Sequence, residues 1–361
     1  MSAAEMSHAG LQDLPELRDF SDRAYRKNDI TFTNAYFDWQ FNRCGGAARP
    51  HNGALIARKG GAVIGNCLVP SYDISMNGEI RQGGWIHEWF VDPGHGALGL
   101  IMLRKMLKGL AFFAGAGISS HGLAAMRAVC PTMTLFALNR TFAVFDAEKT
   151  FALSFHTKPC TLTYLKGLRP PPPPATVTVE LIDRFDARFD AAWDAFREGI
   201  TLATHRTSAF MNWRYLDHPV FTYQAARASG PAGDVHCVWR MEQVHGSDTR
   251  VARICEVIGS PQAIAESLPA ILAVMGADGA AFADFFCSHA ETVGATITAG
   301  MHAVVARSDF VLARLFQPLA DTVAHSLDYY FYLPGAARPG DYSRCYFTKG
   351  DSNQDRPNIV S

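Results

Sequence analysis

One short pattern occurs twice in the chain, about half a chain length apart. Residues 36–41 read Tyr-Phe-Asp-Trp-Gln-Phe and residues 210–215 read Phe-Met-Asn-Trp-Arg-Tyr, so each copy has an acid or amide before a tryptophan and an aromatic residue at each end. Stretches typical of short strands and then of a helix follow both copies. The pattern therefore predicts a duplicated α/β unit. The alternative is an unrelated α/β protein whose halves merely look alike.

A run of five prolines separates the two copies. Pro170 to Pro174 predict an extended spacer, because each proline ring fixes φ and removes a backbone donor. Two domains of usual size fit on either side of it. We therefore expect an N-terminal domain over 1–169, a proline-rich linker over 170–176, a C-terminal domain over 177–335 and a polar tail over 336–361. The alternative for the prolines is a surface loop inside one domain.

Hydrophobic periodicity and turn residues predict the secondary structure of both halves. The Lys59-Gly60-Gly61 turn between two apolar runs predicts a β-hairpin over 54–69. Further elements are expected as a strand over 85–91, a helix over 100–114, a strand over 118–126, a helix over 132–140 and a strand over 151–164. In the second half we expect strands over 223–228, 235–243 and 250–258, a helix over 261–275, a strand over 281–287 and a helix over 289–299.

Composition and charge restrict the class of protein. The chain has 33 basic and 34 acidic side chains, and a formal net charge of -1 removes the bulk electrostatic argument for binding nucleic acid. Its eight cysteines are scattered singly, which is typical of buried reduced thiols in a cytoplasmic protein. We expect no metal, because no His-x-x-x-His pair or carboxylate cluster occurs. We also expect no signal peptide or membrane insertion, because the N-terminus lacks a basic and apolar leader.

A strand, a glycine-rich turn and a helix form the sharpest chemical signal. Trp85 to Pro93 is typical of a strand that ends at a proline, and Gly94 to Gly99 opens an apolar helix. Glycines at a helix N-terminus let backbone N–H groups approach an anion, which the helix dipole also favours. The turn therefore indicates a pyrophosphate site. The alternative is a plain connection between strand and helix.

This arrangement resembles the acyl-CoA motif of the GNAT family of acyltransferases. The resemblance implies two tandem GNAT-like domains of the α/β (α+β) class, each with a mixed, mostly antiparallel sheet flanked by helices. It also implies an acetyl-CoA or other acyl-CoA co-substrate, held in the first half by Phe90, Val91, Gly94, His95, Gly96, Ala97 and Gly99. The chain departs from the family pattern because Gly94 or His95 stands where an arginine is expected. The second half has Gly259-Ser260-Pro261 and no glycine cradle, so we expect one competent donor site at most.

Glu88 is the candidate general base. The resemblance places such a carboxylate on this strand, and Glu256 has the equivalent place in the second half. A carboxylate near the acceptor amine would take its proton as the nitrogen attacks the thioester. The alternative is a structural ion pair with an arginine. No general acid is assigned, because the helix expected over 132–140 contains no tyrosine.

Other residues are candidates for binding the acceptor. Trp39, Arg214 and His218 lie in or next to the repeated pattern, and purely structural packing is the alternative for them. The tail is rich in hydrogen-bonding groups, and its Asp355 and Arg356 suit sugar hydroxyls, an anionic ligand or a nucleotide. The tail resembles the ending of GNAT-like proteins from bacterial exopolysaccharide pathways. A disordered tail is the alternative.

The resemblance as a whole implies an N-acyltransferase that acts on an amino sugar or other amine in exopolysaccharide or cell-envelope synthesis. Its acceptor would be a small molecule or glycan, with contact to membrane-associated polysaccharide machinery. Two alternatives stay open. One is a catalytically inactive double-GNAT module that binds polysaccharide or nucleotide. The other is a relative of the aminoacyl-tRNA-dependent peptidoglycan transferases, for which the net charge supplies no basic groove.

Overall fold

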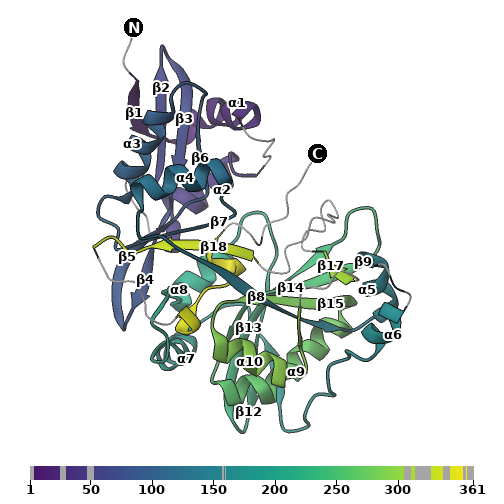
Figure 1. Ribbon diagram of the computed structural model, residues 1–361. Coiled ribbons are helices and arrows are strands. Elements are labelled where there is room, and N and C mark those ends of the chain that lie inside the picture. The colour runs from purple at the N-terminus through teal and green to yellow at the C-terminus, as the bar shows by residue number, and fades with distance from the viewer. Residues whose placement is uncertain are drawn as a thin grey trace.

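The computed structural model describes residues 4–24, 30–46, 53–156, 158, 160–304, 310–313, 327–335, 342–352 and 355. Two halves of mixed α/β structure share one large sheet, and helices flank it (Figure 1). The predicted fold class is therefore confirmed. Arg356, a predicted binding residue, lies outside the described residues.

The first half contains nine strands and six α-helices among the described residues. They are β1 (Glu5–His8), α1 (Leu14–Ala24), α2 (Asn34–Phe37), β2 (Ala54–Lys59), β3 (Ala62–Leu68), β4 (Ser71–Met76), β5 (Glu79–Trp85), β6 (Glu88–Val91), α3 (Gly96–Leu107), β7 (Phe112–Ala116), α4 (Ser120–Val129), β8 (Thr134–Val144), α5 (Ala147–Leu153), β9 (Ser154–His156) and α6 (Cys160–Lys166). A π-helical turn, η2 (Asp38–Asn42), follows α2 directly.

The second half follows the proline run. It contains β10 (Thr178–Leu181), α7 (Ala187–Arg197), β11 (Leu202–Thr204), α8 (Ser208–Met211), β12 (Gln224–Gly230), β13 (Gly233–Gln243), β14 (Arg250–Ile258), α9 (Pro261–Ala277), β15 (Ala280–Cys287), α10 (Ala290–Thr298), β16 (His302–Ala303), β17 (Phe310–Leu312), β18 (Leu327–Tyr332) and β19 (Cys345–Tyr346). A π-helical turn, η4 (Asn212–Leu216), follows α8, and a short 3-10 turn, η6 (Lys349–Asp351), follows β19. The strands and helices predicted for this half are found.

Four predicted elements of the first half differ in the structure. The helix predicted over 100–114 ends at Leu107, and Phe112–Ala116 form β7 instead. The strand predicted over 118–126 is wrong, because Ser119 caps the helix α4 there by accepting a hydrogen bond from the Gly122 N–H. The helix predicted over 132–140 is wrong as well, because these residues begin β8, which contains two threonines and two phenylalanines. The strand predicted over 151–164 is mostly helical, with only β9 extended.

The repeated pattern forms the same structure twice. Thr33 caps α2 and Thr207 caps α8, and each short α-helix continues into a π-helical turn that carries the tryptophan. The two turns meet: the rings of Trp39 and Trp213 stack with centroids 4.7 Å apart. Trp39 Nε1 donates to Trp213 O (2.8 Å), and Trp213 Nε1 donates to Trp39 O (3.0 Å). The two copies of the pattern therefore contact each other reciprocally through their tryptophans.

The large sheet continues across the proline run. Its strand order is β10-β12-β13-β14-β15-β8-β18-β7-β5-β4-β11-β19, with β16 paired to β8. β8 comes from the first half but pairs with β15 of the second half, while β18 comes from the second half and pairs with β7 of the first. Each half therefore uses a strand of the other to extend its sheet.

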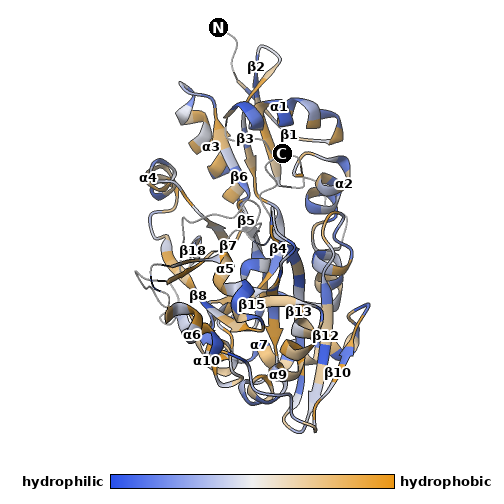
Figure 2. Cartoon of the chain, turned by 90° about the vertical axis from the view of Figure 1, so that its right-hand side faces the viewer, coloured by the Kyte–Doolittle hydropathy of each residue, from blue (hydrophilic) through white to orange (hydrophobic). Residues whose placement is uncertain are grey.

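A smaller sheet of the order β1-β2-β3-β6 completes the first half. Apolar residues line the inner side of its helix α1, where Leu17 and Phe20 are buried, and Figure 2 shows polar residues on the outer side. Met102 and Leu103 of α3 pack on the other face, in one cluster with Leu55 and Phe113. This sheet ends at the glycine-rich turn and positions it.

Candidate functional site

Two neighbouring strands of the first half separate and form a fork. β5 runs parallel to β7 up to Trp85, which lies opposite Ala114. Ile86 N donates to Ala114 O (2.8 Å), but the next N–H, of His87, donates to Leu68 O of β3 (2.8 Å). From there β6 pairs with β3 alone, so it is an edge strand of the described sheet. The fork leaves the side of β6 that faces β7 available for another chain or ligand.

The glycine-rich turn lies at the end of β6. Gly94 has a φ of 87°, a conformation that favours glycine, and an added Cβ at Gly94 or Gly96 would meet no atom within 4 Å. α3 begins at Gly96, and its N-cap residue His95 makes no side-chain capping hydrogen bond. Gly94, Gly96 and Ala97 are exposed. The first N–H groups of α3 are therefore accessible to an anion.

Lys59 adds a positive charge beside this turn. It ends β2, and its Nζ lies 3.4 Å from His95 Nε2. An ammonium group near the N-terminus of α3 favours a phosphate there together with the helix dipole. The sequence analysis did not single out Lys59, because only the register of the β2–β3 hairpin brings it to a turn that is distant in sequence.

Gly99 has a different role from Gly94 and Gly96. An added Cβ would lie 3.1 Å from Val91 Cγ2, and the Gly99 carbonyl accepts a hydrogen bond from Trp89 Nε1 (3.1 Å). Gly99 therefore lets α3 pack closely on β6, one turn away from the accessible N–H groups. Val91, on the same strand, contributes packing here with its side chain.

Glu88 lies at the start of β6 and is 6% exposed. Asn66 of β3 donates from Nδ2 to Glu88 Oε2 (3.2 Å) and accepts a hydrogen bond from Phe90 N at Oδ1 (3.1 Å). Asn66 thus fixes the carboxylate and occupies one backbone N–H of β6. The sequence analysis missed Asn66, because the cross-strand register that pairs it with Phe90 is not visible in the sequence.

The second half contains an equivalent fork. β14 runs parallel to β15 as far as Ile254, which lies opposite Phe285, and residues 255–258 then leave β15. This fork holds the C-terminal segment 345–351 of the chain itself. Phe347 N donates to Ser288 Oγ (2.9 Å), next to the end of β15.

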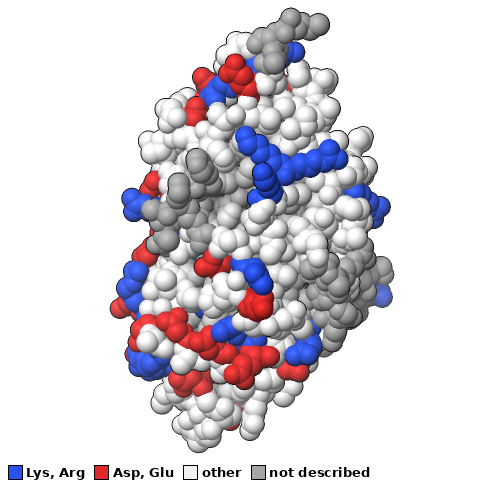
Figure 3. All heavy atoms as spheres, turned by 90° about the vertical axis from the view of Figure 1, so that its left-hand side faces the viewer, with Lys and Arg blue, Asp and Glu red and all other residues white. Residues whose placement is uncertain are grey.

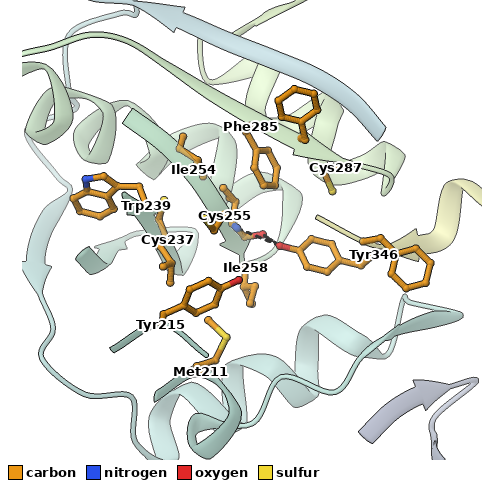
Figure 4. Packing of buried hydrophobic residues seen from close by; sticks show 14 of the residues in the cluster. Met211, Tyr215, Cys237, Trp239, Ile254, Cys255, Ile258, Phe285, Cys287 and Tyr346 are labelled. Atoms are coloured by element: carbon orange, nitrogen blue, oxygen red, sulfur yellow. Dashed lines mark hydrogen bonds between the residues drawn. The ribbon is translucent and has the colours of Figure 1, made fainter. Parts of the chain in front are cut away.

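Tyr346 connects this segment to β14 on the other side of the fork. Its hydroxyl accepts a hydrogen bond from Val257 N (3.2 Å) and lies 3.0 Å from Val257 O. Figure 4 shows the Tyr346 ring reaching toward the end of β14, opposite the ring of Tyr215. The place that corresponds to the open fork of the first half is therefore filled by the protein.

Glu256 is part of this closed arrangement. Its carboxylate accepts hydrogen bonds from Arg206 Nε (2.9 Å), Tyr215 Oη (2.7 Å) and Tyr346 Oη (2.9 Å). Arg206 also forms an ion pair with Asp351 of the C-terminal segment (2.7 Å). Burial raises the pKa of Glu256 above its ordinary value, and the charge of Arg206 opposes this rise. Glu256 thus binds protein groups in place of the expected open cleft.

Arg214 and Asp355 also bind each other instead of facing a cleft. Arg214 donates to Asp355 Oδ1 (2.8 Å) and to Gly350 O (2.9 Å), and Tyr223 Oη donates to Asp355 Oδ2 (2.5 Å). Burial would raise the pKa of Asp355, but the charges of Arg214 and Arg240 hold it below its ordinary value. Asp355 is therefore a charged anchor of the tail, which is ordered at this residue.

Trp39 and His218 pack between the halves. The His218 ring lies 4.4 Å from the Trp39 ring, and its Nδ1 accepts hydrogen bonds from Val220 N (3.1 Å) and Phe221 N (3.0 Å). Burial, aided by the charge of Arg214, lowers the pKa of His218 to about 3. His218 is therefore neutral at physiological pH and supports the contact of the two repeats.

A hollow of about 740 Å³ lies beside the stacked tryptophans. Its lining combines both copies of the pattern and comprises Ala35, Asp38, Trp39, Arg43, Arg184, Ser208, Ala209, Asn212, Trp213 and Asp217. The charged residues are paired within each half, Arg43 with Asp38 (2.9 Å) and Arg184 with Asp217 (2.7 Å). This leaves no uncompensated charge to select a ligand.

The described residues contain no group of three histidine, cysteine, aspartate or glutamate side chains arranged to hold a metal ion. All eight cysteines are free, and only Cys160 is exposed. No helix in the described ranges has the length and apolar character needed to cross a membrane.

Solved structures with a similar fold include one with a bound acyl-CoA. N-myristoyltransferase of Saccharomyces cerevisiae with bound myristoyl-CoA aligns with a TM-score of 0.53 and 8% identity over 92% of this chain and 83% of that chain. A GCN5-related N-acetyltransferase from Anabaena variabilis aligns with a TM-score of 0.58 and 9% identity, covering 92% and 73% of the two chains. A GCN5-related N-acetyltransferase from Kribbella flavida aligns with a TM-score of 0.55 and 14% identity, covering 91% of this chain and 70% of that chain. The chain therefore has a GNAT-like fold. No protein-family model matches the sequence, and no curated protein matches it significantly.

Proposed function

We propose that the protein is an acyl-CoA-dependent N-acyltransferase with a single donor site, in its first half. One observation carries this proposal: the first fork is open and ends at the accessible N-terminus of α3, whereas the second fork holds the C-terminal segment. The N–H groups of α3 and the ammonium group of Lys59 would bind the pyrophosphate. The pantetheine chain would lie along the free side of β6.

The reaction would follow from a donor held in this way. The acceptor nitrogen attacks the thioester carbonyl carbon, a C–N bond forms, and the C–S bond breaks to release CoA. Glu88 would accept the proton lost by the amine, directly or through a water molecule. Asn66, which donates to Glu88 Oε2, would keep the carboxylate in one orientation. The products would be an N-acylated acceptor and CoA.

The finer assignments go beyond the fold. We propose acetyl-CoA as the first donor to test and an amino sugar or other amine as the acceptor, in exopolysaccharide or cell-envelope synthesis and in the cytoplasm, as the resemblance of the tail suggests. Two of the residues proposed for the acceptor, Arg214 and Asp355, are engaged with each other, so the acceptor would have to use other groups. An acceptor on the α1 side of the sheet fits the position of Glu88 beside Asn66.

A second candidate is a binding module without catalysis. The observation that favours it is that Glu88, the candidate base, is only 6% exposed and already accepts a hydrogen bond from Asn66 of β3. The second fork, closed by Tyr346, shows that this fold keeps a fork without a donor. The two candidates differ in whether acyl-CoA binds at all.

Isothermal titration with acetyl-CoA and with myristoyl-CoA tests the proposal. The wild type should bind one equivalent, and Gly96→Asp should abolish binding by placing a carboxylate beside the pyrophosphate. Gly96→Ala should still bind, because a Cβ meets no atom there. Gly294→Asp, an exposed change in α10, is the matched control and should bind like the wild type. A folded wild type that binds neither donor would contradict the proposal and favour the binding module.

A further inference from the structure

Acidic residues are missing from one long part of the chain. Between Asp92 and Asp146 the sequence contains no aspartate or glutamate, although the whole chain has 34 of them and a net charge of only -1. This part includes α3 and α4 and the basic residues Arg104, Lys105, Lys108 and Arg127. Positive charge is therefore concentrated locally in a nearly neutral protein.

The basic residues of α3 lie on its outer side. Ile101, Arg104, Lys105 and Lys108 are spaced three and four positions apart, which puts them on one face of the helix. All four are exposed, Ile101 to 49%, while Met102 and Leu103 point into the core. These four residues therefore form an exposed stripe along α3, with three cations next to one apolar side chain.

The neighbouring helix α4 extends this stripe. Arg127 in its last turn is exposed, and Met126 beside it packs in the same cluster as Met102 and Leu103 of α3. No ion pair links Arg104, Lys105, Lys108 or Arg127 to an acidic side chain of the described residues. Figure 3 shows a group of basic side chains without acidic ones on this side of the molecule, at the height of α3 and α4.

We infer that this basic face docks the protein on an anionic phospholipid surface. Cations near such a surface each contribute about a fivefold gain in binding, and the exposed Ile101 beside them adds apolar contact with the interface. Neither α3 nor α4 contains a tryptophan, tyrosine or phenylalanine that could stack on nucleic-acid bases. Peripheral docking needs no membrane-spanning helix. The inference is independent of the proposed acyl transfer.

Sedimentation of the full chain with lipid vesicles tests this inference. Vesicles of phosphatidylcholine with phosphatidylglycerol should bind the protein, and pure phosphatidylcholine vesicles should not. High salt should weaken the binding. The triple variant Arg104→Glu, Lys105→Glu, Lys108→Glu should lose about 100-fold or more in vesicle affinity, given a fivefold contribution from each cation.

A triple variant with the same charge change serves as the control. Lys149→Glu, Lys166→Glu and Arg169→Glu are exposed changes outside α3 and α4, and this variant should bind vesicles like the wild type. Equal losses in both variants, or a wild type that ignores anionic vesicles, would overturn the inference. Binding of duplex DNA or an acidic peptide through the same three side chains, without vesicle binding, would also overturn it. Circular dichroism checks that both variants fold. Titration of both variants with acetyl-CoA shows whether the donor site is intact, so a failure of this inference can be told apart from a failure of the proposed function.

Discussion

Glu88 and Asn66 form the smallest unit on which the proposed chemistry depends. Replacing Glu88 by Gln keeps its size but removes the base, so turnover should fall by about 10²- to 10⁴-fold while donor affinity stays unchanged. Release of CoA, followed with a thiol reagent in the presence of amine acceptors, measures turnover. Glu79→Gln, an exposed change at the start of β5, is the control and should leave the rate unchanged. If both variants turn over alike, Glu88 is not the base.

Gly115 on β7 is a second residue on which the fork depends, because its position leaves no room for a side chain. A Cβ added there would overlap Tyr330 of β18 and Ile86, at the point where β6 leaves β7. Gly115→Ala should therefore lower the free energy of unfolding by about 1–3 kcal/mol, as overpacking of a dense core does. Urea unfolding followed by tryptophan fluorescence measures it. The open-space substitution Gly96→Ala should leave the stability nearly unchanged, and an equal effect of both would refute the packing argument.

At the scale of elements, the C-terminal segment 345–351 is held by buried charges. Arg206 is fully buried between Glu256 and Asp351, so Arg206→Met would leave two buried carboxylates without the cation that pairs with both. We expect it to lower the free energy of unfolding by about 3–5 kcal/mol. Arg184→Met removes the same kind of side chain from an exposed pair with Asp217 and should lower it by less than about 1 kcal/mol. Similar losses in denaturant titrations of the two variants would contradict this role of Arg206.

Elements with purely local signals could be predicted, and those decided by distant pairing could not. The hairpin at Gly60-Gly61 and the helix α9, capped by Ser260, carry their turn and cap residues in the sequence, and both were predicted. β8 was mistaken for a helix because its partners, β15 and β18, lie more than a hundred residues further along the chain. The same limit applies to the site. The glycine turn was visible in the sequence, but Lys59 reaches this turn, and Asn66 reaches Glu88, only through strand register.

At the scale of the whole molecule, two buried histidines couple stability to pH. Burial lowers the pKa of His218 to about 3 and that of His236 to about 4, whereas an unfolded chain has a histidine pKa of about 6.5. Between these values the unfolded state binds protons that the folded state does not, so the contribution of these histidines to stability is complete above pH 6.5 and falls as the pH drops.

Urea titrations at pH 7 and pH 5 should therefore show a lower free energy of unfolding at pH 5. Each histidine contributes at most about 1.4 kcal/mol per pH unit in this window. His236→Leu should reduce the difference between the two pH values, while His245→Leu, at an exposed position, should leave it unchanged. A difference that does not respond to His236→Leu would mean that His236 does not contribute to this proton uptake.

The exchange of β8 and β18 makes the two halves depend on each other for folding. Without the second half, β7 loses β18, its described partner on one side, and β8 loses both β15 and β18. Unpaired edges of this length favour aggregation. The reciprocal hydrogen bonds of Trp39 and Trp213 are lost at the same time. We therefore expect fragments 1–169 and 170–361 to be insoluble or unfolded when expressed separately.

The two fragments should form a soluble complex when they are expressed together, because every strand then finds its partner. Copurification of an untagged fragment with a tagged one, followed by circular dichroism, measures this. Trp213→Ala in the second fragment should weaken the complex, since it removes the stacked ring and one of the two reciprocal hydrogen bonds. A fragment 1–169 that folds alone and binds acetyl-CoA would show that the donor site needs neither β18 nor the second half. The second half would then be an independent module, and the shared sheet would serve only to join the two.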